Sequence, residues 1–491
     1  MSTETRRRRW ILAATILGSA MAFIDGSVVN IALPVMQRTL SATVTDAQWI
    51  VDAYLLALAS LLLAGGALGD HLGRMRMFAA GVVIFAGASV WCGLAPDTRH
   101  LIAARALQGI GGALLVPGSL AIIAATFPAS ERGKAIGTWS AMTSMALIAG
   151  PLLGGWLVQT VSWRAIFFIN IPIAVVTLLI VWRTWSPRDS AEAGDVRSID
   201  WAGTVLITVA LAALTYALIE KRQYLSFGIA VIAFVAFIIL EKRVKNPIGP
   251  LVLFRSRSFA AANVLTLLLY AALNVAIFLL PFNLIQLQHY SPARTGAAFL
   301  PLVAAMSLLS RFTGAFADRV GPRLLLFFGP LIVAIGFLLL ALPGIGGSYW
   351  TTFFPGLVVI GIGMATTVAP LTTTVMTSVD NPHHVGAASG VNNAVSRVAG
   401  LLAIAFFGAV SIFIFARSLE ARLGPGNAML SQSAKLAEAE PPSNVDEATR
   451  RRMRAAVEIA FLRTFRINMI AAAALAACSG GAALWIRSRK S

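Results

Sequence analysis

The chain has 491 residues, of which 58% are hydrophobic and only 12% are charged. Soluble domains carry about 25% charged residues, so this composition excludes a soluble globular protein and indicates one that crosses a membrane many times. The formal net charge of +18 does not indicate nucleic acid binding, because basic residues also anchor the loops of membrane proteins to the cytoplasmic side.

The sequence also argues against a disulfide or metal site and against an ATPase. The two cysteines, Cys92 and Cys478, each lie inside an apolar stretch, which favours small buried residues over a disulfide or a metal ligand. The phosphate-binding pattern G-x-x-x-x-G-K-[ST] does not occur in the sequence, which argues against a built-in ATPase. We therefore expect neither an enzyme nor a metal site.

Apolar stretches long enough to span a bilayer follow one another along the whole chain. A spanning helix needs about 20 apolar residues. The sequence predicts fourteen spans, at residues 10–34, 48–69, 77–95, 101–126, 136–160, 165–184, 201–219, 224–240, 259–287, 295–316, 323–342, 349–374, 391–416 and 467–486. The predicted fold class is all-α and integral to the membrane, and the even number of spans places both termini on one side.

The distribution of basic residues gives the orientation. If the N-terminus is inside, the inner segments hold 21 Lys and Arg residues and the short outer loops hold 6, so both termini are predicted to be cytoplasmic. The long outer segment 417–465 does not bear on this count, since long loops cross regardless of charge. Its second part, residues 446–465, has helical spacing of apolar positions, and a helix on the membrane surface or over the outer mouth is predicted there.

A short polar loop occurs twice between apolar stretches, with the shared pattern G-x-x-x-D-x-x-G-x-R. The first copy begins at Gly66 and the second at Gly314. The copies join spans 2 to 3 and 10 to 11, which predicts two six-helix halves with two helices inserted between them. The predicted domains are an N-terminal bundle (1–184), a linker with two inserted helices (185–258) and a C-terminal bundle (259–491) that includes the outer loop 417–465.

These loops are predicted to form a latch between the two halves on the cytoplasmic side. Glycine permits a tight turn, and an aspartate can accept hydrogen bonds from amides at a helix N-terminus. The latch would form in the outward-open state and break in the inward-open state; the alternative is that the basic residues only set the topology. The predicted latch residues are Gly66, Asp70, Gly73, Arg74, Asp318, Gly321 and Arg323.

Three ionisable residues lie inside predicted spans at a similar depth: Asp25, Asp52 and Arg105. A charge within the membrane is costly unless it is paired or faces water, and it usually marks an ion or substrate pathway. We expect Asp25, with Asp52, to face a central cavity near Arg105 and to take up and release protons there. The alternatives are that Asp25 is a structural hydrogen-bond partner of Asn30 or of a neighbouring helix, that Asp52 snorkels to the interface, and that Arg105 is a purely structural ion-pair partner.

Polar and aromatic residues on span 259–287 are the candidates for substrate contact in the second half. Tyr270 and Asn274 recur at about helical spacing and, with Phe278, could line the cavity; polar contacts that hold helices together explain them equally well. The predicted substrate-binding residues are Asp25, Asn30, Asp52, Tyr270, Asn274 and Phe278. Arg397, deep in span 391–416, is left open between function and structure.

A cluster of small residues interrupts span 136–160. Gly150, Pro151, Gly154 and Gly155 combine a G-x-x-x-G pair with a proline. Small residues let helices approach closely, and proline bends a helix. We expect a bend that closes the inner cavity against leak, although helix packing alone also explains the cluster.

Four of these patterns resemble motifs of the major facilitator superfamily. The duplicated loop resembles motif A, Arg105-Ala-Leu-Gln-Gly109 resembles motif B, and Ala146-Leu-Ile-Ala-Gly-Pro-Leu-Leu-Gly-Gly155 resembles motif C, which is associated with antiporters. Ile24-Asp-Gly-Ser-Val-Val-Asn-Ile-Ala-Leu-Pro34 resembles the first-span motif of the 14-spanner drug:proton antiporters, with serine where that motif usually has threonine.

The resemblance implies the major facilitator fold, with two six-helix bundles and two extra helices. It also implies multidrug efflux: export of small amphipathic or cationic compounds across the cell membrane in exchange for protons, by alternating access. The expected energy source is the proton gradient with no cofactor, and the expected partners are the substrate, protons and the bilayer, with the protein a monomer. The alternatives are an uptake symporter of the same fold and a membrane sensor that does not transport.

Overall fold

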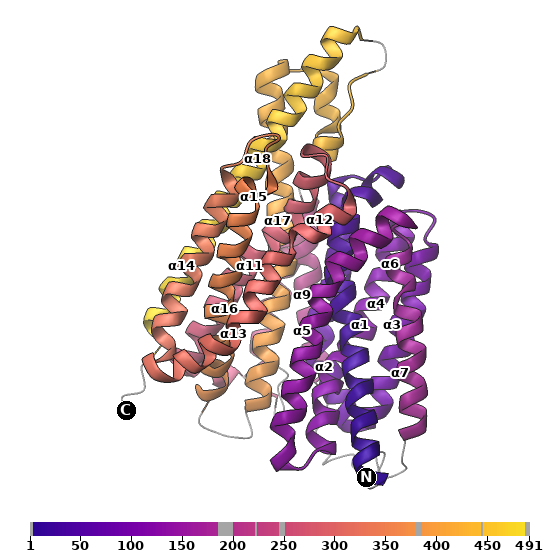
Figure 1. Ribbon diagram of the computed structural model, residues 1–491, viewed down its shortest axis with the longest axis vertical. Coiled ribbons are helices and arrows are strands. Elements are labelled where there is room, and N and C mark those ends of the chain that lie inside the picture. Colours follow the sequence, from indigo (N-terminus) through magenta and orange to yellow (C-terminus); the bar gives the residue numbers. More distant parts are fainter. Residues whose placement is uncertain are drawn as a thin grey trace. The chain divides into compact units, whose positions relative to one another are not determined.

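The computed structural model describes residues 3–184, 200–220, 223–244, 251–379, 385–442 and 445–486. Every regular element within these ranges is a helix (Figure 1). Thirteen of the helical segments are long and apolar enough to cross a membrane. The predicted all-α membrane fold is therefore confirmed.

The helices fall into two groups along the chain. The first group comprises α1 (Thr3–Thr39), α2 (Val44–Leu72), α3 (Arg74–Leu94), α4 (Thr98–Thr126), α5 (Ala129–Thr160), α6 (Ala165–Phe168), α7 (Asn170–Thr184), α9 (Trp201–Ile219) and α10 (Tyr224–Glu241). The second group comprises η1 (Leu251–Arg255), α11 (Arg257–Phe282), η2 (Asn283–Leu287), α12 (Pro292–Ala298), α13 (Leu300–Val320), α14 (Pro322–Ala341), α15 (Tyr349–Thr352), α16 (Phe354–Thr377), α17 (Val385–Leu423), η4 (Ala428–Glu438), α18 (Glu447–Ala482) and η5 (Ala483–Trp485).

Each of the fourteen predicted spans coincides with one helix or with two consecutive helices. The stretch 136–160 lies in α5, which is not among the thirteen candidate spans of the described residues. The helical positions predicted from hydropathy are thus confirmed, and the crossing of the membrane by α5 stays a prediction.

The chain divides into two compact units. The first unit contains residues 1–29, 50–217 and 222–251, and the second contains residues 30–49, 218–221 and 252–491. Two features differ from the predicted domains. The inserted helices α9 and α10 belong almost entirely to the first unit, and the α1–α2 turn (30–49) belongs to the second.

Close backbone contacts hold the first unit together. A Cβ atom added at Gly111 in α4 would collide with the backbone of α3 at Gly81 and Phe85. One added at Gly109 would collide with the backbone of α2 at Tyr54. Membrane helices lack a hydrophobic driving force for association, so close packing at small residues takes its place.

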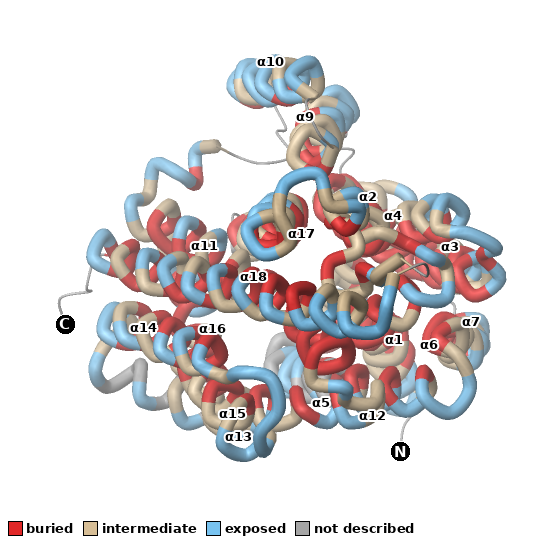
Figure 2. Tube along the Cα trace, turned by 90° about the horizontal axis from the view of Figure 1, so that it is seen from above, coloured by how far each residue is buried: buried red, intermediate tan, exposed pale blue. Residues whose placement is uncertain are grey.

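The inserted helix α10 is exposed over most of its length (Figure 2). Its exposed side chains are apolar, with Ile232 at 70% and Val235 at 49% of full exposure. Such a surface is unfavourable in water but suits contact with lipid chains.

In the second unit, α14 packs against α16 and α18, and α11 packs against α17 and α18. Figure 1 shows the amino-terminal part of α18 beside the carboxyl-terminal end of α17, at the top of the view. The predicted helix at 446–465 is present and is continuous with the last span in α18, whereas its place on the membrane surface or over the outer mouth stays a prediction. The continuity has a physical reason: Val457, Phe461 and Phe465 are buried on one side of the helix.

The two cysteines differ in their surroundings. Cys92 is buried, as predicted, whereas Cys478 is exposed on α18, and neither forms a disulfide. The prediction for Cys478 is wrong because a small apolar side chain suits a lipid-facing surface as well as a protein interior.

Candidate functional site

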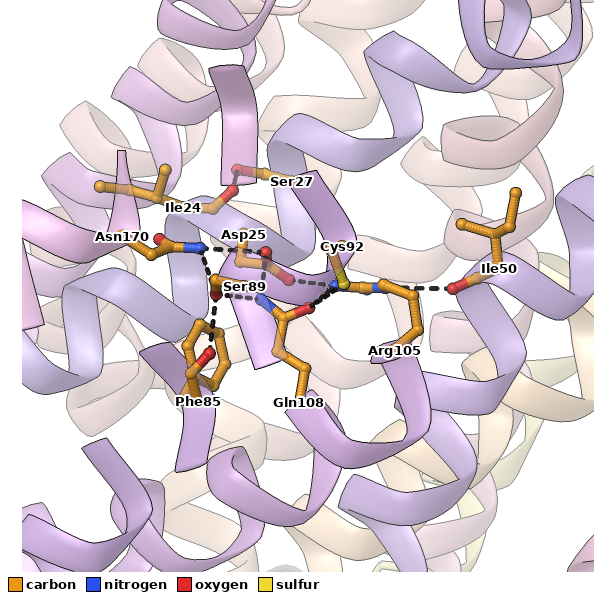
Figure 3. Close-up of polar contacts among 10 residues, drawn as sticks. All are labelled: Ile24, Asp25, Ser27, Ile50, Phe85, Ser89, Cys92, Arg105, Gln108 and Asn170. Carbon is orange, nitrogen blue, oxygen red and sulfur yellow. Dashed lines mark hydrogen bonds and ion pairs between the residues drawn. The ribbon is translucent and has the colours of Figure 1, made fainter. Parts of the chain in front are cut away.

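A buried ion pair lies inside the first unit. Asp25 of α1 and Arg105 of α4 are 0% and 1% exposed, and Arg105 Nη1 lies 2.5 Å from Asp25 Oδ2 (Figure 3). Two charges removed from water are tolerated only when their geometry is good and further hydrogen bonds satisfy them. The neighbours of the pair supply these hydrogen bonds.

Two side-chain amides bind the same carboxylate. The amide nitrogen of Gln108 donates to Asp25 Oδ1 over 2.8 Å, and that of Asn170 donates to the same oxygen over 3.3 Å. The Gln108 carbonyl oxygen in turn accepts from Arg105 Nη1 over 2.6 Å. Gln108 therefore bridges the two charges and is part of the ion pair's immediate surroundings.

A second layer fixes the orientation of these amides. The Ser89 hydroxyl of α3 accepts hydrogen bonds from Gln108 over 2.9 Å and from Asn170 over 3.2 Å. It donates its own proton to the Phe85 carbonyl over 2.7 Å. Side chains from α1, α3, α4 and α7 thus meet in one polar network (Figure 3).

Aromatic rings and a backbone carbonyl complete the surroundings of Arg105. Its Nε donates to the Ile50 carbonyl of α2 over 3.1 Å. Its guanidinium carbon lies 4.3 Å from the centre of the Tyr54 ring and 6.0 Å from that of Phe167, and such cation–π contacts stabilise a desolvated cation. The sequence predicts that Asp25 faces a central cavity, but in this structure these groups enclose the ion pair.

Asp52 is separate from this network. Its side chain is fully buried, and neither carboxylate oxygen accepts a hydrogen bond from a described residue. The Asp52 side chain therefore does not snorkel to the membrane interface in this structure. A buried carboxyl group without donors is costly in its charged form.

The glycine–proline cluster of α5 packs directly against the segment of α1 that carries Asp25. A Cβ added at Gly150 would collide with the side chain of Ser27, and one added at Gly154 would collide with Val28. Pro151 lies inside α5 between these contacts. The cluster thus brings α5 into close contact with α1 at Ser27 and Val28.

The predicted substrate residues of α11 differ in accessibility. Tyr270 and Asn274 are partly accessible, and the Asn274 amide donates to the Tyr270 carbonyl over 2.8 Å. Phe278 is buried and packs on Phe282 with ring centres 5.5 Å apart, so it contributes to the core here. Asn30 is also buried, near the end of α1 that belongs to the second unit.

Both copies of the duplicated loop make the predicted tight turn. Gly73 precedes α3 with φ of 99°, and Gly321 precedes α14 with φ of 82°, a conformation that side chains other than glycine rarely adopt. Arg323 donates to the Leu484 carbonyl over 2.9 Å. The side chains of Asp70 and Asp318 lie outside the described residues, so the latch stays a prediction.

Sequence reasoning found the charged residues of the network but missed the neutral ones. Gln108 entered only as part of the segment that resembles motif B, and Ser89 and Asn170 were not predicted as site residues. A signal was present: Asn170 is the first residue of α7, whose other residues up to Trp182 are almost all apolar, and amides in such helices form hydrogen bonds between helices.

A bundle of apolar helices with a buried, hydrogen-bonded ion pair defines a polytopic membrane protein. The model of the Major Facilitator Superfamily matches residues 15–404. The chain belongs to this superfamily.

Several curated relatives carry names that refer to drug resistance. The chain is 34% identical to the multidrug resistance protein Stp of Mycobacterium tuberculosis (strain CDC 1551 / Oshkosh), over 84% of this chain and 77% of that protein. It is 35% identical to the puromycin resistance protein pur8 of Streptomyces alboniger, over 82% of each. It is 33% identical to the tetracenomycin C resistance and export protein of Streptomyces glaucescens, over 89% and 84%.

Solved structures support the fold. A bacterial homologue of the human lysosomal transporter Spinster, in an inward-facing and unoccupied conformation, matches with a TM-score of 0.70 and 18% identity over the full length of both chains. A bacterial homologue of the human peptide transporters PepT1 and PepT2 matches with a TM-score of 0.63, 15% identity and coverage of 99% and 98%.

Proposed function

We propose that this protein exports small amphipathic or cationic compounds in exchange for protons, by alternating access. It would lie in the cell membrane with both termini in the cytoplasm, as a monomer, with the proton gradient as its energy source and no cofactor. The distribution of Lys and Arg supports this orientation.

The observation that carries the proposal is the enclosed pair of Asp25 and Arg105. Protonation of Asp25 would remove one of the two charges and leave the Arg105 guanidinium without its counterion inside the protein. That change is costly in a dry interior, so the protonated form favours a different arrangement of α1 and α4. A proton on Asp25 would thereby be coupled to a change of conformation.

Asp52 supports the same proposal from α2. Its carboxyl group is buried without donors, where a charge is costly, whereas the Asp25 carboxyl group is paired with Arg105 and accepts hydrogen bonds from Gln108 and Asn170. Two carboxyl groups in different surroundings would let the protein carry a proton at one while the other is charged. A cationic substrate would compete with the proton for the charged group.

The relatives support the substrate class. Three of them are named for resistance to several drugs, to puromycin and to tetracenomycin C. We propose that this chain likewise exports antibiotic-like amphipathic compounds, whose apolar parts suit a cavity between membrane helices.

The test is proton release from inverted membrane vesicles that contain the protein and a pH-sensitive dye in an acidified lumen. Addition of a transported compound should release protons from wild-type vesicles, and Asp25→Asn should abolish the release. Asp97→Asn is the matched control, because Asp97 is exposed and lies between α3 and α4; it should behave as wild type.

Two outcomes would contradict the proposal. Substrate-triggered proton release that survives in Asp25→Asn would exclude Asp25 as the coupling residue. Proton-driven accumulation of the compound in right-side-out vesicles would instead support the uptake symporter.

A further inference from the structure

A row of polar side chains runs along the contact between α11 and α17 in the second unit. At one end, the Asn392 amide of α17 donates to the Asn263 carbonyl oxygen over 3.2 Å and to the Thr266 hydroxyl over 2.7 Å. These hydrogen bonds join the two helices side chain to side chain. The polar groups here satisfy one another.

The row continues along the same two helices. Arg397 of α17 and Tyr270 of α11 lie along their helices between the contact of Asn392 with Thr266 and the contact of Gly400 with Asn274. One turn further, Asn274 packs against Gly400, where an added Cβ would lie 3.1 Å from the Asn274 amide carbon. We call this set the α11–α17 polar row: Asn263, Thr266, Tyr270, Asn274, Asn392, Arg397 and Gly400.

Arg397 is the unsatisfied member of the row. Its guanidinium forms no hydrogen bond or ion pair with any described residue, and the Tyr270 hydroxyl forms no hydrogen bond with any of them. Both side chains are partly accessible. A cation inside a membrane segment normally has a counterion or faces water, so the contrast with Arg105, which is paired with Asp25, needs an explanation.

Contact with the lipid interface does not explain it. Phe406 and Phe413 of α17 are 47% and 62% exposed, as expected for side chains that face lipid. At about 100° per residue they lie on roughly the opposite side of the helix from Arg397. Arg397 therefore does not share the side of α17 that carries these exposed apolar side chains.

We propose that Arg397, with Tyr270 and Asn274, binds the carboxylate or a similar acidic group of an amphipathic compound. The planar guanidinium presents two parallel N–H groups that match the two oxygens of a carboxylate. The phenol and the amide can add neutral hydrogen bonds beside it. The use of this subsite in export rests on the proposed function, and it extends the substrate class from cations to zwitterions and acids.

The test compares binding of matched acids and esters to the purified protein in lipid nanodiscs. The pairs are rhodamine B with its ethyl ester and dodecanoic acid with ethyl dodecanoate, and the readouts are dye anisotropy and the shift of the thermal unfolding midpoint. Wild type should prefer the acid in at least one pair. Loss of a charged hydrogen bond in Arg397→Gln should weaken binding of that acid about 10-fold or more, with the ester unchanged.

Two further variants separate binding from structure. Arg397→Lys should keep part of the preference, since the charge remains but the two-pronged geometry is lost. Arg417→Gln is the matched control in the same helix, because Arg417 is 71% exposed and pairs with Glu420 over 3.7 Å; it should bind both members as wild type does.

Equal binding of acid and ester by wild type in both pairs, including no binding of either, would overturn the proposal. Equal weakening of acid and ester in Arg397→Gln would also overturn it, because that is the result of a structural role. The assay uses no proton gradient, so failure of proton-coupled export would leave its outcome unaffected.

Discussion

Gly150 of α5 lies so close to Ser27 of α1 that no side chain can be added at Gly150 without a collision. The Ser27 hydroxyl donates to the Ile24 carbonyl over 2.9 Å, so it is held on the side that α5 covers. Asp25, the acid of the buried ion pair, lies between Ile24 and Ser27 in α1. Close packing of α5 on α1 and the position of the proton-binding candidate are therefore linked.

Gly150→Ala should destabilise the protein by about 1–3 kcal/mol, because the added methyl group overpacks the contact. Ser27→Ala removes the nearest atom and should restore part of the stability in the double variant. Thermal unfolding of the purified proteins in detergent measures both effects. Gly137→Ala in the same helix is the control, since an added Cβ there meets no atom within 4 Å. Additive effects of the two substitutions would show that Ser27 is not the colliding group.

Arg105→Gln should destabilise the protein by about 3–5 kcal/mol, because it leaves the buried Asp25 carboxylate without its counterion. Asp25→Asn in the same chain should recover much of this loss, since no unpaired charge then remains. Denaturation measures the free energy of unfolding of the two single variants and of the double variant. A double variant less stable than Arg105→Gln alone would show that the charge pair is not the cause.

Hydropathy and charge predicted much of this arrangement, and their limits have physical reasons. Asp25 and Arg105 were found because a charge in an apolar stretch is conspicuous and costly. Gln108, Ser89 and Asn170 were missed because neutral polar side chains are also common as contacts between helices. Their role depends on convergence from three helices, which no single stretch of sequence encodes.

The second unit illustrates another limit. Residues 446–465 are too polar to be recognised as part of a span, so the sequence suggested a separate helix. In the structure the segment is continuous with the last span because one side of it is buried in the protein, which a search for uniformly apolar stretches cannot detect. The turns at Gly73 and Gly321, by contrast, were predicted from residue type, because a positive φ restricts the choice mainly to glycine.

Asp52→Leu should leave the protein at least as stable as wild type while it abolishes proton-coupled transport. Neither carboxylate oxygen is hydrogen-bonded to a described residue, so the replacement removes a buried polar group without breaking a contact. Thermal unfolding and proton release from inverted vesicles are the two measurements. A loss of stability above about 2 kcal/mol would indicate that Asp52 has a structural partner.

Arg38 near the end of α1 pairs with Glu438 of η4 over 2.6 Å, with the two side chains 49% and 19% exposed. Because water screens the pair, a double-mutant cycle with alanine should give a coupling of only about 0.2–1 kcal/mol. The coupling should fall when salt is raised from 0.05 to about 0.5 M. A coupling that is large and independent of salt would contradict this estimate.

The backbone amides in the first turn of α18 should lose protection from hydrogen exchange in acid. Hydrogen bonds from Thr449, including that from its amide over 3.0 Å, lower the pKa of Asp446, the residue that caps this helix. A carboxyl group with a lowered pKa in the folded state stabilises that state above its unfolded pKa of about 3.9, and the contribution is lost as the pH falls through the folded pKa. Amide hydrogen exchange at Thr449 and Arg450 should therefore accelerate, relative to its intrinsic rate, below about pH 4. Asp446→Asn keeps a capping oxygen that does not titrate. In this variant the amides of Thr449 and Arg450 should be less protected from exchange at neutral pH, and their protection should not change with pH in this range. The same acid-induced loss in Asp446→Asn would assign the effect to another group.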